Sequence, residues 1–320
     1  MNYAVTREAV VPPEYGGTRL DRAVAAIWAD YSRTRIRQWI ESGELTLDGA
    51  RTEPRYKLRG GETIAVSARL EPVIESRPEP IALDIVYEDE HLIVIDKPAG
   101  LVVHPGAGNS GGTLLNALLH HDPGLARVAR AGIVHRLDKD TSGLLVIARE
   151  VSVQARLATM IEKREVKRIY RAVCQTAMTG GGVIDAPIDR SPRDRKRMAV
   201  REGGRDSRTH YRLIERFRAH SHIELELESG RTHQIRVHLA HIRAPVIGDS
   251  VYGGRPRLPP RPSEALKLAL QGFGRQALHA HRLAFEHPVD ARSLEFVSPL
   301  PADIEQLLAT LRQDLGQAAR

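Results

Sequence analysis

The segment IVHRLDKDTSGLLVIA, residues 133–148, places a dense run of charged residues between two apolar stretches. Leu144 to Ala148 is apolar without interruption and has the length of a strand, which is typical of strands buried on both faces. The polar part, His135 to Gly143, therefore predicts a loop beside a buried strand. Loops of this kind often carry functional residues, whereas composition alone favours an ordinary turn capped by an aspartate.

A second polar segment, SGRTHQIRVH, covers residues 229–238. Arg231 and Thr232 are expected to open a helix. Its apolar residues recur at helical spacing, at Ile235, Leu239 and Ile242. Arg236 lies next to this apolar face, so its charge can point into the protein, where a buried arginine needs a carboxylate partner. A purely structural ion pair is the alternative interpretation.

The pattern around these two segments predicts an α+β fold. Short apolar runs predict strands at 91–95, 101–104, 144–148, 168–174 and 223–228. Amphipathic spacing predicts helices at 113–120, 151–163, 232–242 and 302–313. Strands and helices do not alternate regularly, which favours a mixed sheet over a doubly wound one. Two polar stretches, 187–208 and 254–263, show no hydrophobic period and are expected to form loops or hairpins.

The composition of the sequence and its turn-forming residues divide the chain into three regions. Residues 1–70 predict a small unit with two helices, whose apolar residues recur at Leu20, Val24 and Ile27 and then at Ile36, Trp39 and Ile40. Ser32 and Gly43 are candidate caps of the second helix, and Asp48-Gly49 predicts a tight turn. Residues 71–82 are rich in proline and charge and predict an extended, exposed linker. Residues 83–320 predict one larger domain.

Charge and cysteine content narrow the class of protein. Lys and Arg total 47 against 40 Asp and Glu, a net charge of +7, which favours an anionic partner such as nucleic acid or an anionic membrane surface without choosing between them. The single cysteine, Cys174, excludes an intrachain disulfide and favours a reducing compartment. The N-terminus lacks the apolar core of a signal peptide, and no apolar run reaches the ~18 residues that a membrane helix needs. We therefore expect a cytoplasmic protein without a membrane partner.

The sequence offers no pattern for a cofactor or metal. It has no P-loop lysine motif, no GxGxxG opening a helix and no GxSxG elbow. His233, His238 and His241 do not share one helix face, and Asp249 is the one carboxylate near them, so a metal site is not expected. Aromatic residues make up 4%, too few for a stacking platform.

HRLDKDTSG, residues 135–143, resembles the signature of the RluA-type pseudouridine synthases, and GRTHQIRVH, residues 230–238, resembles the second signature of that family. Glu88-Asp89 with Lys97-Pro98, and Arg168-Ile169-Tyr170, resemble two further family motifs, and residues 1–70 resemble an S4 RNA-binding domain. Residues 101–109, 115–120 and 248–256 resemble most closely the members that modify large-subunit (23S) ribosomal RNA. Arg168 and Asp96 depart from the lysine and asparagine common in relatives.

The resemblance implies a small S4-like domain and a larger mixed-sheet catalytic domain. It implies that Asp138 is the catalytic carboxylate, that Tyr170 stacks near the flipped base, and that Arg236 pairs with Asp138. Arg136 would enter the helix where the target base has left. Further arginines are expected to contact RNA; they are Arg33, Arg35, Arg37, Arg193, Arg195, Arg197 and Arg231.

The implied reaction is an isomerisation, so it needs no metal and no small-molecule cofactor. The expected partner is ribosomal RNA or the pre-ribosomal large subunit. The protein is expected to be a monomer. Three alternatives stay open. One is the same chemistry on transfer RNA or other ribosomal uridines, and another is a non-enzymatic RNA-binding ribosome assembly factor. The third, an N-glycosidase, would need a second carboxylate, for which Asp140 is the candidate.

Overall fold

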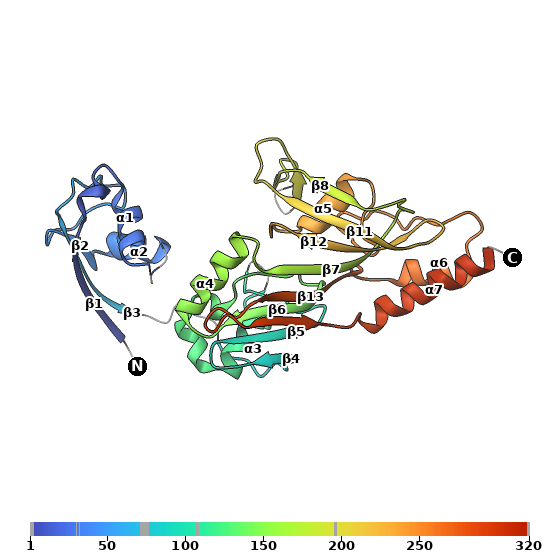
Figure 1. The fold of residues 1–320 in the computed structure, drawn as a ribbon, viewed down its shortest axis with the longest axis horizontal. Coiled ribbons are helices and arrows are strands. Elements are labelled where there is room, and N and C mark those ends of the chain that lie inside the picture. Colours follow the sequence, from blue (N-terminus) through green and yellow to red (C-terminus); the bar gives the residue numbers. More distant parts are fainter. Residues whose placement is uncertain are drawn as a thin grey trace. The chain divides into compact units, whose positions relative to one another are not determined.

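The computed structural model describes residues 3–29, 31, 33–70, 77–106, 109–194 and 197–318. The chain divides into two compact units, Met1–Glu75 and Ser76–Arg320 (Figure 1). Two residues of the sequence predictions, Ser32 and Arg195, lie outside the described residues, as does the 71–76 part of the predicted linker.

The first unit is a three-stranded antiparallel sheet with two α-helices. Its strands have the order β1-β3-β2. The elements are β1 (Tyr3–Val10), η1 (Pro13–Tyr15), α1 (Leu20–Ile27), α2 (Arg33–Ser42), β2 (Leu45–Leu47) and β3 (Thr63–Leu70). The apolar residues that predicted the two helices form the core of this unit, with Leu20, Val24 and Ile36 fully buried. Asp48 and Gly49 both have positive φ, as the predicted tight turn after β2 requires.

The second unit is built on a nine-stranded mixed sheet of order β4-β5-β6-β13-β7-β12-β11-β8, to which β14 adds beside β13. The strands of this sheet are β4 (Ile85–Glu88), β5 (Leu92–Lys97), β6 (Ser142–Ala148), β7 (Lys167–Cys174), β8 (Gly182–Asp185), β11 (Arg208–Arg216), β12 (Ser221–Leu227), β13 (Leu278–Glu286) and β14 (Ser293–Val297). A separate hairpin pairs β9 (Ile188–Arg190) with β10 (Met198–Val200).

Strand β13 makes the sheet mixed. It runs parallel to β6, where His279 and Ala280 face Ser142 and Gly143, and antiparallel to β7 and β14. Strands β5 and β6 are almost wholly buried, in keeping with their uninterrupted apolar runs. The mixed sheet with helices confirms the predicted α+β class.

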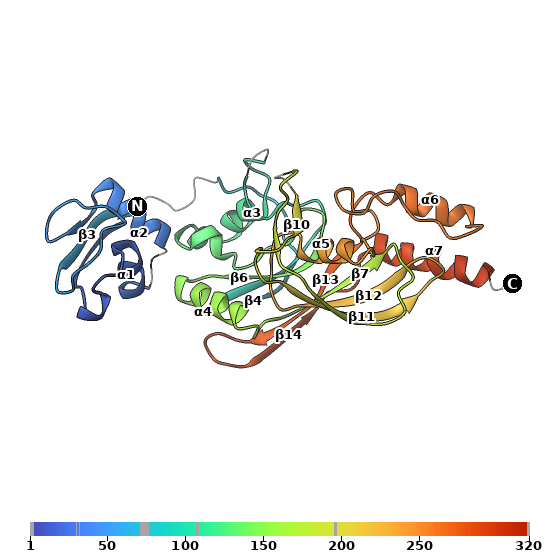
Figure 2. The same ribbon diagram turned by 90° about the horizontal axis from the view of Figure 1, so that it is seen from above.

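Helices and 3-10 turns cover the sheet and connect its strands. They are α3 (Leu114–His121), η2 (Pro123–Arg127), η3 (Ala129–Gly132), α4 (Val151–Glu162), α5 (Gln234–His241), α6 (Glu264–Gly272) and α7 (Ala302–Ala318). In Figure 2, α3, α5 and the β10 hairpin lie on the same side of the sheet. Among the described residues, no helix is long and apolar enough to cross a bilayer.

Several predictions of elements need correction. Residues 101–104 are not a strand, because Val102 makes a single isolated bridge with Thr113. Helix α5 begins at Gln234 and not at Thr232, because His233 adopts a left-handed conformation with φ 57°. The polar stretch 187–208 contains the β9–β10 hairpin, as expected, whereas α6 and the strands β11 and β13 were not predicted.

Residues 77–81, in the predicted linker, are attached to the second unit. Asn116 on α3 donates from Nδ2 to the Arg77 carbonyl at 2.8 Å. Its backbone carbonyl accepts the Glu79 N–H at 3.0 Å. The Glu79 carboxylate accepts the Gly112 N–H at 3.0 Å. This part of the stretch is thus fixed to α3 and the loop before it.

Candidate active site

Asp138 lies in the loop that joins η3 to β6, and hydrogen bonds from distant segments hold that loop. The carbonyl of Lys139 accepts the Gly100 N–H at 2.9 Å and the ammonium of Lys97 at 2.9 Å. Arg275 donates from Nη1 to the Asp140 carbonyl at 3.2 Å. These donors come from residues that precede and follow the loop in the sequence of the second unit, so the backbone next to Asp138 is fixed by tertiary structure.

Lys97 is fully buried at the end of β5. Its ammonium donates to three carbonyls, those of Pro98 at 2.7 Å, Leu101 at 3.0 Å and Lys139 at 2.9 Å. Burial lowers the pKa of Lys97 to about 8, against the opposing charges of Asp140 and Asp138. The buried cation therefore stabilises the loop by saturating backbone acceptors.

Gly143 ends the polar segment at a point where β6 meets β13. Its φ is +113°, and a Cβ at this position would lie 2.3 Å from the carbonyl oxygen of Ala280. A side chain would therefore separate the two strands, and glycine is required for both its conformation and its size. This close approach brings the loop that carries Asp138 against the centre of the sheet.

Arg236 on α5 joins two carboxylates. Its Nε and Nη2 donate to Oδ2 and Oδ1 of Asp249 at 2.7 and 2.8 Å, and its Nη1 donates to Oδ2 of Asp138 at 2.8 Å. The side chains of Arg236, Asp138 and Asp249 are 6%, 14% and 0% exposed. Burial would lower the pKa of Arg236, but the two carboxylates outweigh it and raise that pKa above its ordinary value.

Asp249 is the more buried of the two carboxylates. Besides Arg236, its Oδ1 accepts the backbone N–H groups of Val251 and Tyr252 at 2.9 and 3.0 Å. Burial opposes ionisation, yet the bonds and charge of Arg236 and these N–H groups keep the pKa of Asp249 below its ordinary value. Asp249 is therefore an ionised anchor for the arginine.

Side chains of α5 lock the helix to the sheet. Gln234 donates from Nε2 to Arg208 O and Thr209 Oγ1, both at 3.0 Å, and its Oε1 accepts from Ser229 Oγ at 2.8 Å. His238 lies between Thr209 Oγ1 at 2.8 Å and Ala186 O at 2.9 Å. His238 is thus a satisfied buried histidine, and the helix places Arg236 rigidly.

His233 and Tyr252 complete the surroundings of Asp138. His233 Nε2 lies 3.8 Å from Asp138 Oδ1, and His233 Nδ1 lies 2.9 Å from the hydroxyl of Tyr252. The Tyr252 ring centre lies 5.1 Å from Cζ of Arg236, within cation–π range. The polar cluster therefore contains five side chains from three segments.

Tyr170 lies on β7 and is 6% exposed. Burial raises its pKa above the ordinary value; the Asp138 charge adds to this, and Arg168 opposes it. Arg168 is two residues away on the same strand and shares its buried face. The guanidinium of Arg168 is buried, and its Nε and Nη2 have no partner among the described residues.

In the second unit, the arginines expected to contact RNA lie in three places. Arg136 is exposed in the loop that carries Asp138. Arg193 and Arg197 are exposed on the β9–β10 hairpin, and Arg197 Cζ lies 5.3 Å from the Tyr252 ring centre. Arg231 precedes α5, and its guanidinium donates to the Asp206 carbonyl at 3.3 Å.

In the first unit, the predicted RNA contacts lie at the start of α2 and take part in interactions within the protein. Arg33 binds the buried carboxylate of Asp21 at 2.7 and 2.9 Å. Arg37 binds Glu41 one turn along the helix at 2.7 Å. Arg35, which lies between them, also interacts within the chain. An RNA contact by Arg33 would thus share its guanidinium with Asp21.

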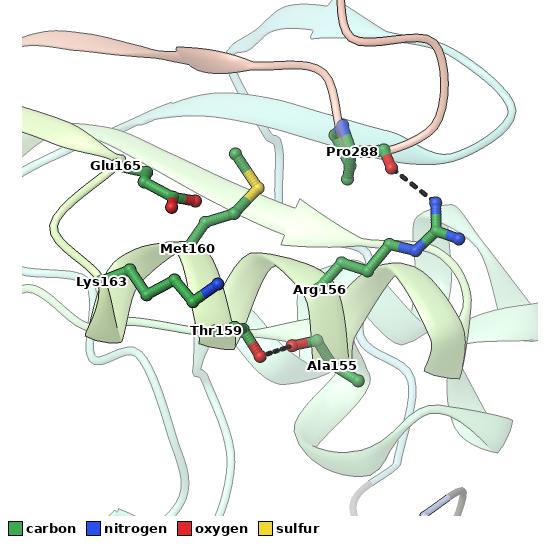
Figure 3. A pocket seen from close by; sticks show the side chains of 7 residues that line it. All are labelled: Ala155, Arg156, Thr159, Met160, Lys163, Glu165 and Pro288. Atoms are coloured by element: carbon green, nitrogen blue, oxygen red, sulfur yellow. Dashed lines mark hydrogen bonds between the residues drawn. The ribbon is translucent and has the colours of Figure 1, made fainter.

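A surface pocket of about 450 Å³ lies away from this cluster, on α4 and the turn after β13 (Figure 3). It is lined by Ala155, Arg156, Thr159, Met160, Lys163, Glu165 and Pro288. Arg156 closes one side by donating to the Pro288 carbonyl at 2.7 Å. None of these residues belongs to the cluster around Asp138.

Comparison with known proteins shows what this arrangement is related to. Residues 91–241 match the RNA pseudouridylate synthase family, and residues 18–64 match the S4 domain. The ribosomal large subunit pseudouridine synthase D of Xanthomonas campestris pv. campestris is 53% identical, over 98% of this chain and 95% of its own length. The protein of that name from Pseudomonas aeruginosa is 51% identical over 98% of each chain.

The chain belongs to the RNA pseudouridylate synthase family. The synthase also resembles a solved structure, human RNA pseudouridylate synthase domain containing 4, with a TM-score of 0.55 and 26% identity. That similarity covers 72% of this chain and 93% of the human one. Membership confirms the resemblance drawn from the two signatures and identifies the chain as an RNA-modifying isomerase with an S4 domain.

Sequence reasoning missed several residues of the synthase's site. Asp249 was noted as the one carboxylate near the histidines but was not assigned to Arg236. Tyr252 and His233 received no role beside Asp138, and Lys97 was noted only within a motif. The sequence did contain a hint that Asp249 and Tyr252 belong to the site, because both lie in residues 248–256, which resemble the corresponding stretch of family members.

Proposed function

We propose that the synthase converts uridines of large-subunit ribosomal RNA to pseudouridine, with Asp138 as the catalytic carboxylate. The names of the bacterial relatives support this substrate class. The observation that carries the role of Asp138 is the asymmetry of its two oxygens. Oδ2 is held by Arg236 at 2.8 Å, whereas among the described residues no group donates a hydrogen bond to Oδ1. One oxygen is thus anchored and the other is available to substrate.

The reaction breaks the bond between uracil N1 and ribose C1′ and forms a bond between C5 and C1′. The C5 proton is lost and N1 gains a proton, so atoms and electrons balance within the nucleotide. Asp138 acts in its ionised form, as a nucleophile or as a base. Arg236 orients the carboxylate, and Asp249 in turn orients Arg236.

Tyr170 is proposed to stack against the flipped uracil and to assist removal of the C5 proton late in the reaction. Its place on β7, where the Asp138 charge contributes to its raised pKa, supports a shared role. A raised pKa keeps the phenol neutral, which favours contact with an uncharged base. Tyr170 would then assist proton removal by orienting the base and not as a phenolate that takes the proton.

Base flipping is proposed because the reacting atoms of a stacked uridine are not accessible. Unstacking costs a few kcal/mol, least where the base is mismatched or already single-stranded. Arg136 is exposed and lies two residues before Asp138, so its guanidinium can occupy the space that the base leaves. We propose that this replacement offsets part of the cost.

RNA affinity is proposed to come mainly from phosphate contacts of the β9–β10 hairpin and of α2 in the S4 unit. Arg193 and Arg197 are exposed on the hairpin. We also expect the active form to be a monomer, which light scattering of the RNA-free protein would test.

The deciding experiment compares Asp138→Asn with its matched control Asp140→Asn in the same loop. Each variant is incubated with large-subunit RNA, and pseudouridine is mapped by position. We expect Asp138→Asn to lose all detectable product while keeping RNA affinity within about tenfold, or about 1.4 kcal/mol. Asp140→Asn should retain most of its activity.

The alternatives give different outcomes in the same assay. Release of free uracil that depends on Asp140 would identify an N-glycosidase. Product in transfer RNA or in other ribosomal RNA, with none in large-subunit RNA, would overturn the substrate assignment. RNA binding without any product from the wild-type protein would leave an assembly factor as the function.

A further inference from the structure

His233 and Tyr252 connect the free oxygen of Asp138 to the basic hairpin. His233 Nε2 lies 3.8 Å from Asp138 Oδ1, and its other ring nitrogen, Nδ1, lies 2.9 Å from the Tyr252 oxygen. That oxygen also accepts the backbone N–H of Met198, at the start of β10, at 2.9 Å. A chain of three contacts thus runs from the hairpin to the carboxylate.

The hydrogen bonds of Tyr252 favour one tautomer of His233. The Tyr252 hydroxyl has one hydrogen to donate, and among the described residues His233 Nδ1 is the acceptor within reach. If the hydroxyl donates to Nδ1, the neutral imidazole must carry its hydrogen on Nε2. Nε2 is the nitrogen that faces Asp138 Oδ1.

The backbone of His233 supports a positional role. His233 has φ 57° and ψ 20°, the left-handed conformation, directly before the first residue of α5. A residue other than glycine adopts this conformation at a cost of about 1 kcal/mol or more, and such residues concentrate at functional sites. The bend aims the ring of His233 at Tyr252 and Asp138.

We propose that Tyr252 and His233 are a positioning pair for Asp138. The Tyr252 hydroxyl fixes the Nε2–H tautomer of His233. This N–H lies 3.8 Å from Oδ1, too far for a hydrogen bond, so it orients the carboxylate by charge–dipole attraction and leaves Oδ1 available to the nucleotide. The pair is complete when the hairpin supplies Met198 N–H to Tyr252, so docking of the hairpin and assembly of the site are linked. This inference rests on the proposed role of Asp138 and adds two residues to it.

The pair also makes a prediction about pH. The groups that face His233 are Asp138 and Arg136 from the loop before β6, Arg236 from α5, and Asp249 and Tyr252 from the turn after α5. Burial lowers the pKa of His233, and Asp138 opposes that shift. Protonation of Nδ1 requires the Tyr252 hydroxyl to give up its bond, and it turns the ring into a cation beside Oδ1 that competes with the nucleotide for this oxygen. Removing the hydroxyl should therefore make protonation, and the loss of rate that it causes, easier.

The test is Tyr252→Phe, which keeps the ring over Arg236 and deletes the hydroxyl. Single-turnover rates on pre-bound RNA are measured from pH 5 to 8. We expect the acid limb to move to higher pH and the rate at pH 6 to fall about tenfold, the worth of about one hydrogen bond, with RNA affinity within about twofold. Tyr87→Phe is the matched control, because it deletes a hydroxyl that binds Asp89 and Arg292 outside the site, and it should behave as wild type.

A second variant separates tautomer control from packing. His233→Gln keeps an N–H donor but cannot titrate, so its acid limb should not respond to Tyr252→Phe in the double variant. A wild-type pH profile for Tyr252→Phe, or a shift that persists in the double variant, would overturn the pair. The thermal midpoint of each variant shows whether it folds. If Tyr252→Phe does not fold, the test is His233→Gln alone: a fall in its rate at low pH that matches that of the wild type would overturn the proposal. Activity in Asp138→Asn would overturn the proposed function instead.

Discussion

Arg236 and Asp249 form a fork of two hydrogen bonds, Nε to Oδ2 at 2.7 Å and Nη2 to Oδ1 at 2.8 Å. This fork leaves Nη1 of the arginine for Asp138. The planar guanidinium therefore has a fixed orientation before substrate binds, and a lysine at the same position could not reproduce it. Asp249 thus controls the geometry of Asp138 without touching it.

Asp249→Asn should destabilise the synthase by about 3 kcal/mol, because it leaves the buried charge of Arg236 with one carboxylate fewer. Turnover of bound RNA should fall as well, since Arg236 loses its anchor, whereas RNA affinity should not change. Urea unfolding and single-turnover kinetics measure the two effects. Glu295→Gln is the control: it breaks an exposed pair with Arg282 and should leave the stability close to that of the wild type.

Arg136 and Arg193 should respond differently to neutralisation. Arg193→Ala should weaken binding of cognate and unrelated RNA alike and reduce the slope of log affinity against log salt by about one unit or less. Arg136→Ala should lower the rate of modification more than affinity and leave the slope nearly unchanged. A target uridine that is already unpaired should partly rescue Arg136→Ala, because less unstacking is needed.

The contrary result for Arg136 is also defined. If Arg136→Ala lowers the salt slope and leaves turnover of bound RNA intact, Arg136 is one more phosphate contact and the flipping role is wrong. Arg197 is less suited to this comparison than Arg193, since it also packs on Tyr252.

His222 should make the fold sensitive to acid. It is 4% exposed on β12, and burial lowers its pKa to about 4. An unfolded histidine titrates near 6.5, so between these values the unfolded state binds more protons and stability falls as pH falls. The wild type should lose up to about 3 kcal/mol of its free energy of unfolding through His222 between pH 7 and pH 4, and His222→Leu should not show this loss. Urea unfolding at each pH measures it.

At pH 7, His222→Leu should not destabilise the protein, because both ring nitrogens lack partners among the described residues. His222→Asn is the matched control, since it also abolishes titration but keeps a buried polar group. It should flatten the pH dependence but be less stable than His222→Leu at every pH, because its buried amide has no partner. Equal pH dependence in all three proteins would show that His222 is not a source of acid sensitivity.

Much of the fold could be predicted where local sequence and tertiary environment agree. The runs in β5 and β6 are apolar because both faces are buried, and α3, α4 and α7 lie where amphipathic spacing places helices. Strand β11 was missed because one of its faces is polar and half exposed. Residues 101–104 were assigned wrongly because apolar residues there pack without pairing along a ladder.

The contacts within the site were harder to predict from the sequence than the motifs that contribute its residues. The loop around Asp138 and the helix around Arg236 stand out as polar segments beside apolar ones. The partnership of Arg236 with Asp249, and of His233 with Tyr252, depends on the turn after α5 folding back onto that helix. A local sequence pattern does not predict that this turn folds back onto the helix, because the conformation of a loop depends on tertiary packing.

The loop of Asp138 is held by residues that are translated more than a hundred positions later. Arg275 binds the Asp140 carbonyl, Gln276 donates to Thr141, and His279 bonds to Ser142 across 137 residues of chain. A nascent chain that has emerged as far as α5 already contains Asp138, Arg236 and Tyr170, yet it lacks the strand that fixes the loop. We therefore expect the emerging chain to become active late in its synthesis, when β13 enters the sheet and completes the contacts of this loop.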